Sequence, residues 1–371
     1  MQRLRRAASS VNQAGGASER SSRLNVIEVL AKVAPMISPL KTIAVLTCAL
    51  ALSAGADRLV AQPADTGALQ LEAKIPLGDV RGRIDHMAID LARQHLFVAE
   101  LENNSVGIVD LTNRKVVRTI QGLREPQGVA FVPSMGTLYV ANAGDGSLRL
   151  FLGPEYTAMG QIELGDDADN IRVDSATNHL FVGYGSGGLA VIDTGYFKKG
   201  SDIPLGSHPE GFQLDPSSNQ IFVNLPKARA IAVVDRQTGK QTASWPMRIG
   251  TGNFSMALNQ DAGHVLAAFR TPAKLGVFSI KDGALIASPD ICGDVDDVFV
   301  DAKRHRVYVS CGQGFLDVLD AQASAYKRIV RIPTVSGART SLFVPELDRL
   351  LLAVRAASGE PAAIWVFRPI P

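Results

Sequence analysis

The sequence has few cysteines, and it lacks the short motifs of several common enzyme classes. Three cysteines among 371 residues cannot form the dense disulfide framework of a small secreted domain. HExxH, CxxCH, GxSxG and P-loop motifs are all missing, so nothing indicates a zinc protease, a c-type cytochrome, an α/β-hydrolase or a P-loop nucleotidase. A GxGxxG match at residues 183–188 lies between two predicted strands rather than before a helix, and it therefore predicts a turn.

Long hydrophobic runs are also missing. The apolar stretch at residues 42–54 is shorter than the roughly 20 residues that a transmembrane helix needs. It follows Lys41 and ends at the Ala-Gly-Ala of residues 54–56, which is the pattern of a secretory signal peptide. We therefore predict that residues 1–61 are a targeting region and that the protein is exported, to the periplasm or the extracellular space, with no transmembrane span in the mature chain.

The details of this targeting region stay open. Residues 1–35 are Ser-rich and without periodicity, so Met36 is the expected start of translation, and an unusually long n-region is the alternative. The expected cleavage site is the Ala-Gly-Ala at residues 54–56, and a cut after Ala61 is the alternative. Cys48 lies inside the apolar run, but the preceding Thr47 fits a lipidation signal poorly.

Charge is unevenly distributed along the chain. Residues 1–41 carry seven Lys or Arg and two Glu, a net of +5, so the +2 of the whole chain leaves −3 for the remainder. A slightly acidic body argues against a general nucleic-acid binder, which needs a basic surface. Nucleic acid is therefore not the expected partner.

Two cysteines lie in the body of the chain, Cys292 and Cys311. Residues 295–301 and 305–311 read as a hairpin, and both cysteines fall near its open end. In an oxidising compartment such a pair is a candidate disulfide. Two separate buried thiols are an equal alternative, and no neighbouring Cys or His indicates zinc.

A repeat of about 42 residues runs through the chain from residue 87 onward. Each copy has an apolar strand, a turn, a second strand such as Leu-Phe-Val-Ala at residues 96–99, and a third strand that usually ends in Asp. Seven equivalent positions close the first strand: Asp90, Val132, Asp174, Asp215, Asn259, Asp301 and Val344. Their spacings of 42, 42, 41, 44, 42 and 43 residues, with strands throughout, predict propeller blades rather than a helical solenoid.

The last copy lacks a fourth strand. Residues 71–78 supply one, because their Ile-Pro-Leu-Gly repeats residues 203–206 at the end of the third copy. We therefore predict an all-β, seven-bladed β-propeller over residues 69–371, with four-stranded blades and with the N-terminal strand closing the last blade. A closed ring of this kind is expected to be a monomer.

The blades resemble the YVTN-type (YncE-like) repeat family of WD40-like propellers. The resemblance rests on second strands such as Leu-Tyr-Val-Ala-Asn at residues 138–142 and on residues 215–224, and it covers residues 69–371. It implies an exported bacterial protein and supplies no shared catalytic motif. Single-stranded DNA binding, discussed for YncE-like proteins, remains a second alternative here because of a local basic strip of Lys227, Arg229, Arg270 and Lys274.

Polar residues gather where each innermost strand begins, at one mouth of the predicted channel. The position five before each strand end is polar in six of seven copies, and the next position adds His86, Asn170 and Asp297. The candidate ligand-binding residues are Asp85, His86, Gln127, Asp169, Asn170, Glu210, Asp296, Asp297 and Arg339. The alternative is that these are turn residues bordering a water-filled channel.

The predicted function is that of a binding or interaction protein with its ligand site at this acidic mouth. Converging carboxylates favour a divalent cation such as Ca²⁺, or an amine, and His86 or His208 is placed to act as a base. The alternative is a metal-dependent, lactonase-like hydrolase that uses Asp296 and Glu210. The sequence leaves open whether the protein is an enzyme, and it does not identify a catalytic residue, a cofactor, a small ligand or a partner protein.

Overall fold

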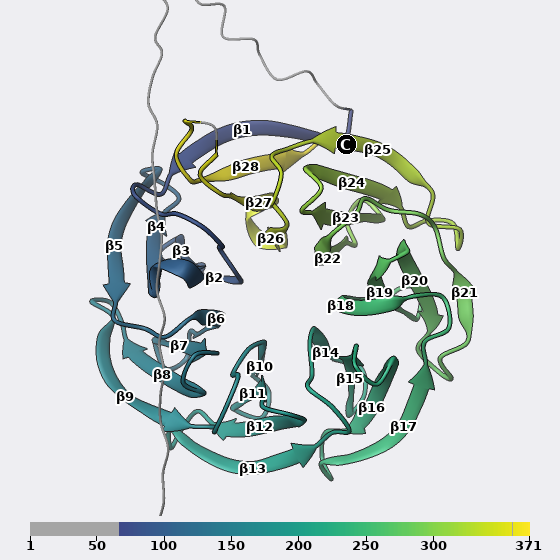
Figure 1. Ribbon diagram of the computed structural model, residues 1–371, viewed down its shortest axis with the longest axis horizontal. Helices are drawn as coiled ribbons and strands as arrows, with labels where there is room; N and C mark the ends of the chain where they lie inside the picture. Colours follow the sequence, from purple (N-terminus) through teal and green to yellow (C-terminus); the bar gives the residue numbers. More distant parts are fainter. Residues whose placement is uncertain (1–66, 358) are drawn as a thin grey trace, which may run out of the picture. The chain divides into compact units, whose positions relative to one another are not determined.

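The protein is a ring of seven four-stranded antiparallel β-sheets, as the computed structural model in Figure 1 shows. The structure describes residues 67–357 and 359–371, so the predicted targeting region, residues 1–61, lies outside the described residues. The predicted fold class, blade number and closure are confirmed. In the described part, no helix has the length and hydropathy needed to cross a bilayer.

Each blade runs from an innermost strand to an outermost one. The first four blades comprise β2 (Met87–Asp90), β3 (His95–Glu100), β4 (Ser105–Asp110), β5 (Lys115–Gln121); β6 (Pro126–Val132), β7 (Thr137–Asn142), β8 (Ser147–Leu152), β9 (Thr157–Glu163); β10 (Ile171–Asp174), β11 (His179–Tyr184), β12 (Gly188–Asp193), β13 (Lys198–Pro204); β14 (Phe212–Leu214), β15 (Gln220–Leu225), β16 (Ala230–Asp235) and β17 (Lys240–Pro246). The last three comprise β18 (Thr251–Asn259), β19 (His264–Thr271), β20 (Ala273–Ser279), β21 (Leu285–Ala287); β22 (Val295–Asp301), β23 (Arg306–Cys311), β24 (Phe315–Asp320), β25 (Arg328–Pro333); and β26 (Thr340–Val344), β27 (Arg349–Val354), β28 (Ala363–Pro369), β1 (Leu69–Pro76). Short 3₁₀ helices occur at η1 (Leu101–Asn103) and η2 (Pro345–Leu347).

The repeated Asp at the end of the innermost strand has a local structural role. Asp90 Oδ1 accepts hydrogen bonds from the backbone N–H groups of Ala92 and Arg93, so its side chain closes the first hairpin turn of blade 1. Asp215 accepts equivalent hydrogen bonds in blade 4, from the backbone and hydroxyl of Ser217. In blade 7 the position is Val344, and η2 makes the turn instead. The recurring Asp is therefore explained by its hydrogen bonds in the turn and not by ligand binding.

The core lies between neighbouring blades. The middle strands are apolar on both faces because each sheet packs against two others, which explains uninterrupted runs such as Leu96 to Ala99, all fully buried. One cluster joins Val98 and Val109 of blade 1 to Leu351 and Ile364 of blade 7. Such clusters fix the angle between blades and therefore the position of every innermost strand.

Blade 7 contains both ends of the propeller. β1 pairs antiparallel with β28, in a register that runs from Leu69 opposite Pro369 to Ile75 opposite Ile364. Leu69 and Ile75 are each 1% exposed. Glu72 reinforces the pairing through ion pairs with Arg349 and Arg368, at 2.6 and 2.9 Å. The ring is therefore closed by hydrogen bonds, apolar burial and charge together.

Candidate functional site

All nine candidate residues line a single cavity of about 280 Å³, here called the mouth cavity. Every blade contributes to it, from Asp85 of blade 1 to Arg339 of blade 7. The innermost strands surround the centre of the ring in Figure 1, so a cavity lined by all seven blades lies on the central axis. The structure thus brings the predicted residues together.

The convergence follows from the repeat. The backbone N–H groups of Asp85, Asp169 and Glu210 each donate to a carbonyl near the end of the next strand, that of Ala99, Gly183 and Asn224, at 2.8 to 3.0 Å. Because the same hydrogen bond recurs from blade to blade, equivalent positions point towards the same place on the axis. A sequence alignment of the repeats is therefore enough to find these residues.

Arginines offset much of the acidity that the sequence predicts. Arg83 pairs with Asp85 at 2.6 Å. Asp296 lies between Arg270, at 2.6 Å, and Arg339, at 2.9 Å. The cavity lining holds six carboxylates (Asp85, Asp167, Asp169, Glu210, Asp296, Asp297) and five permanent cations (Arg83, Arg172, Lys227, Arg270, Arg339). The lining therefore carries one more carboxylate than it has cations, so most of the predicted acidity of the mouth is offset.

The expected Ca²⁺ site is not supported by this arrangement. Among residues 67–357 and 359–371, no group of three or more His, Cys, Asp or Glu side chains is placed to hold a metal ion. Asp296, one of the proposed ligands, is instead engaged by two guanidinium groups. The metal-dependent hydrolase therefore gains no support from the geometry.

Sequence reasoning missed several lining residues, among them Arg83, Arg172 and Asp167. Arg172 lies on β10, two residues beyond Asn170, and alternation along a strand places both side chains on the channel side. The same alternation places Gln213 in the cavity lining. Extending the alignment two positions into each innermost strand would have found Arg172 and Gln213, whereas Arg83 lies two positions before the aligned column.

Two neighbouring residues in the lining of the mouth cavity, Asp169 and Asn170, each have a buried Oδ1 without a hydrogen-bond partner in the described part of the chain, and the residues are 5% and 3% exposed. Two more lining oxygens share this property: Oδ2 of Asp85, which forms an ion pair with Arg83, and Oγ of Ser255. Asn170 Nδ2 donates to Asp169 Oδ2 at 3.1 Å, which fixes the two side chains against each other. The nearest cation to Asp169 Oδ1 is His86 Nε2, too far for a hydrogen bond at 3.7 Å. Unpaired buried acceptors of this kind cost about 1–3 kcal/mol each, so the site is suited to a donor.

Burial shifts the protonation of the acidic side chains. Burial, with the nearby charge of Asp169, raises the pKa of Glu210 to about 8. Burial also raises the pKa of Asp297 to about 7 and that of Asp169 to about 6. Burial alone would lower the pKa of His86, but the charges of Asp85 and Asp169 outweigh it and leave the pKa raised. Asp169, Asp297 and Glu210 therefore gain or lose a proton near neutral pH.

Glu210→Gln is expected to flatten the pH dependence of stability. A carboxyl whose pKa is raised on folding favours the folded state below its unfolded pKa, near 4.5, and this contribution is lost as the pH rises through about 8. The free energy of unfolding of the wild type, measured by denaturant titration, should fall between pH 5 and pH 9, and that of Glu210→Gln should fall less. Glu155→Gln, at an exposed turn position, is the control. Parallel pH profiles for wild type and Glu210→Gln would contradict the shift.

The second candidate base, His208, is held by the backbone. It is 8% exposed, and its Nδ1 lies 2.6 Å from the carbonyl oxygen of Gly185, so Nδ1 is the protonated nitrogen. It lines the mouth cavity beside Asp167, whose Oδ2 is 3.6 Å from Nδ1. This arrangement fixes the orientation of the His208 ring.

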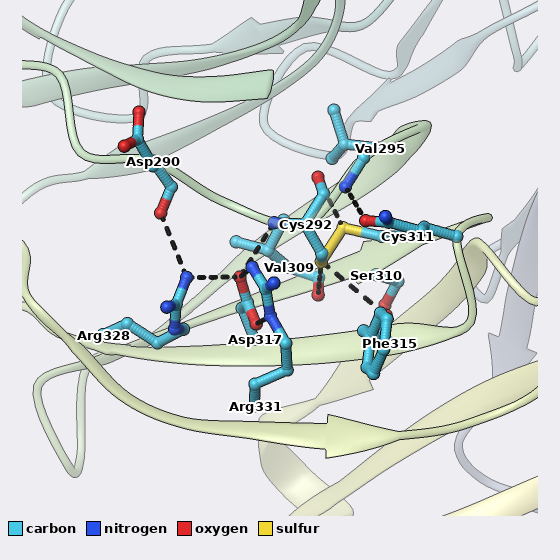
Figure 2. Close-up of a disulfide and its surroundings, with 12 residues drawn as sticks. Asp290, Cys292, Val295, Val309, Ser310, Cys311, Phe315, Asp317, Arg328 and Arg331 are labelled. Atoms are coloured by element: carbon cyan, nitrogen blue, oxygen red, sulfur yellow. Dashed lines mark hydrogen bonds and ion pairs between the residues drawn. A yellow bond between two sulfur atoms is a disulfide. The ribbon is translucent and has the colours of Figure 1, made fainter. Parts of the chain in front are cut away.

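A disulfide anchors the segment that carries the acidic residues of blade 6. Cys292 and Cys311 are bonded, with sulfurs 1.93 Å apart and Cα atoms 5.8 Å apart (Figure 2). The backbone N–H of Cys292 donates to Oδ2 of Asp317 at 2.8 Å. Asp317 is fully buried and accepts two further hydrogen bonds from Arg331, at 2.7 and 2.8 Å. The chain that follows Cys292 therefore leaves a rigid anchor before it reaches Asp296.

Two of the four residues of the basic strip proposed for single-stranded DNA, Arg270 and Lys274, are engaged within the protein. Arg270 pairs with Asp296 and stacks on the ring of Phe254, 4.1 Å from its centroid. Lys274 pairs with Asp290 at 2.6 Å. Cations that already have carboxylate partners contribute little to phosphate binding, so the structure does not favour this alternative.

Solved structures share the fold at low sequence identity. A chain of Kuenenia stuttgartiensis hydrazine synthase matches with a TM-score of 0.65 and 16% identity, over 78% of this chain and 96% of that chain. A chain of the mitotic checkpoint complex matches with a TM-score of 0.68 and 12% identity, over 88% and 98%. No protein-family model and no curated protein matches the sequence. The comparisons therefore support the seven-bladed propeller and do not confirm the YVTN-type family.

Proposed function

We propose that the protein is an exported, monomeric binding protein of the YVTN-type, which holds a small polar molecule with a cationic amine in the mouth cavity. The observation that carries the proposal is the pair of unpartnered, buried acceptors on Asp169 and Asn170. An ammonium group donates several hydrogen bonds and carries the charge that would ionise Asp169 and Glu210. A neutral donor would form the hydrogen bonds, but it would not favour the ionised form of the two carboxyl groups.

A small molecule fits the site better than a protein partner. The mouth cavity holds about 280 Å³, near the lower end of the range for small-ligand pockets, and its acceptors are deeply buried. A protein surface would reach the exposed rim more readily than Asp169. The chains of similar fold come from an enzyme and from a protein assembly, so the fold alone does not choose between these partners.

Export is supported by two independent features. The apolar run at residues 42–54 has the pattern of a signal peptide. The bond between Cys292 and Cys311 is of a kind that persists in oxidising compartments. Cell fractionation, with detection of a processed chain outside the cytoplasm, tests this part of the proposal.

Asp169→Asn is expected to weaken amine binding by roughly tenfold to a hundredfold, because a charge-assisted hydrogen bond becomes a neutral one. Isothermal titration with ethanolamine and putrescine measures the change. Asp261→Asn, an exposed substitution in the turn between β18 and β19, is the matched control and should bind as the wild type does.

Two results would count against the proposal. One is the absence of binding by any simple amine to the wild type. The other is equal affinity in the wild type and Asp169→Asn, with both proteins melting at the same temperature. Binding that persists after exhaustive chelation of metals is expected, because the proposed contacts are direct.

A further inference from the structure

Of the five cations that line the mouth cavity, Arg172 and the exposed Lys227 have no carboxylate partner among the described residues, and Arg172 is the less exposed of the two. Arg83, Arg270 and Arg339 each form an ion pair shorter than 3.0 Å. Arg172 forms no ion pair within 4.0 Å anywhere in the described part of the chain. Its Nη1 donates to the carbonyl oxygen of the adjacent residue, Ile171, at 2.8 Å. The remaining guanidinium N–H groups are therefore available to a ligand.

The surroundings of Arg172 are poorly suited to a charge without a partner. Burial lowers the pKa of Arg172, even though Asp297 and Asp169 act in the opposite direction. The centre of its guanidinium lies 5.4 Å from the ring centroid of Phe212, beyond the close stacking that Arg270 makes with Phe254. Arg172 is only partly exposed, and a cation that is partly removed from water without an ion-pair partner would be stabilised by an anion placed beside it.

Arg172 also marks the floor of the mouth cavity. A second cavity of about 470 Å³, here called the inner cavity, lies deeper along the channel. Six residues line both cavities: His86, Arg172, Gln213, Asp297, Val298 and Phe299. The rest of the inner lining is mostly apolar, and within it Arg172 is the one Arg or Lys. An anionic group that entered from the mouth would thus meet Arg172 at the boundary.

The neighbouring carboxylate at this boundary is itself occupied. Asp297 Oδ2 accepts a hydrogen bond from the backbone N–H of Ser341 at 2.7 Å. Its raised pKa, about 7, also leaves it protonated for part of the time at neutral pH. Repulsion between Asp297 and an incoming anion is therefore weaker than a fully ionised Asp297 would produce.

The donor and acceptor groups come from one stretch of chain. Asp169 and Asn170 immediately precede β10, and Arg172 is its second residue. Three residues of extended chain span about 10 Å between Cα atoms, and the side chains of Asp169 and Arg172 are close enough for the charge of Asp169 to act on the pKa of Arg172. A molecule with its two charged groups separated by a few bonds can reach both ends of this stretch.

We propose that the ligand of the mouth cavity is a zwitterion of the amino-acid type, whose ammonium group binds Asp169 and Asn170 and whose carboxylate binds Arg172. This inference rests on the proposed function, because it assigns the amine to the same acceptors. It adds the second charged group of the ligand and the residue that recognises it. The near balance of cations and carboxylates in the lining agrees with a ligand of no net charge.

The test is a comparison of probes that carry one charge or both. Isothermal titration is carried out with ethanolamine, acetate, glycine, β-alanine and 4-aminobutyrate. At least one of the three zwitterions is expected to bind ten times or more tightly than either ethanolamine or acetate. Arg172→Gln should remove this advantage while ethanolamine binding is kept, and Arg172→Lys should keep part of it. Arg118→Gln, at an exposed position of β5, is the matched control.

The outcomes separate this inference from the proposed function. If ethanolamine binds as tightly as every zwitterion, and Asp169→Asn abolishes that binding, the amine site stands and the zwitterion is excluded. The same holds if Arg172→Gln, with an unchanged melting temperature, keeps the full advantage of the zwitterion. If no probe binds the wild type, both proposals fail. If Arg172→Gln does not fold, Arg172→Lys and Arg172→Met are measured in its place. The inference would be overturned if both variants kept the full wild-type preference for every zwitterion, from glycine to 4-aminobutyrate, over ethanolamine and acetate.

Discussion

A chain that begins at residue 77 is expected to be far less stable than one that begins at residue 67. The shorter chain loses β1 and with it Leu69 and Ile75, both almost fully buried. Removal of a buried Leu or Ile side chain costs roughly 2–5 kcal/mol, so the loss should exceed about 5 kcal/mol in the free energy of unfolding. Denaturant titration of the two chains measures the difference.

The shorter chain should also associate. Without β1, strand β28 becomes an edge with unpaired backbone groups, and such edges pair with other chains. Size-exclusion chromatography is expected to show oligomers for the chain from residue 77 and a single species for the chain from residue 67. If the two chains unfolded at the same denaturant concentration, β1 would not contribute to ring closure.

The second large effect is expected from loss of the disulfide. Its cysteines are 19 residues apart in sequence, and closing a loop of that size stabilises a protein by roughly 3 kcal/mol. Replacing both Cys292 and Cys311 by Ser should lower the free energy of unfolding by about that amount.

Reducing agent provides the control for the disulfide prediction. The wild type should lose stability when it is unfolded in the presence of dithiothreitol, and the doubly substituted protein should not respond. Equal stability of the oxidised wild type and the double variant would show that the network around Asp317 holds the segment without the bond (Figure 2).

The fold could be predicted from the sequence because its determinants are local and repeated. The Asp90 position closes a turn in most blades, and apolar runs such as Leu96 to Ala99 satisfy both faces of a sheet packed between two others. The closing strand could be found because residues 71–78 repeat the outer strand of another blade. Where the blades repeat in the same register, residues at equivalent positions of the repeat lie at equivalent places around the ring.

The candidate site was predictable in position and less so in charge. The nine residues share an alignment column or its neighbour, so their convergence followed from the repeat. Their partners did not, because Arg83 and Arg270 come from outside those columns and reach Asp85 and Asp296 through side-chain conformation. The bonding state of Cys292 and Cys311 was left open for a similar reason. The sequence places both cysteines near the end of a hairpin, but it does not give the distance between their sulfur atoms.

The pairing of β1 with β28 has a practical consequence. Leu69 lies opposite Pro369, so the two ends of the propeller meet in one sheet, on the outer rim of blade 7 and away from the axis (Figure 1). A donor and an acceptor fluorophore attached at these ends would report breathing of the seam by energy transfer. They would do so without occupying the channel, so opening of the ring and filling of the cavity could be followed as separate signals.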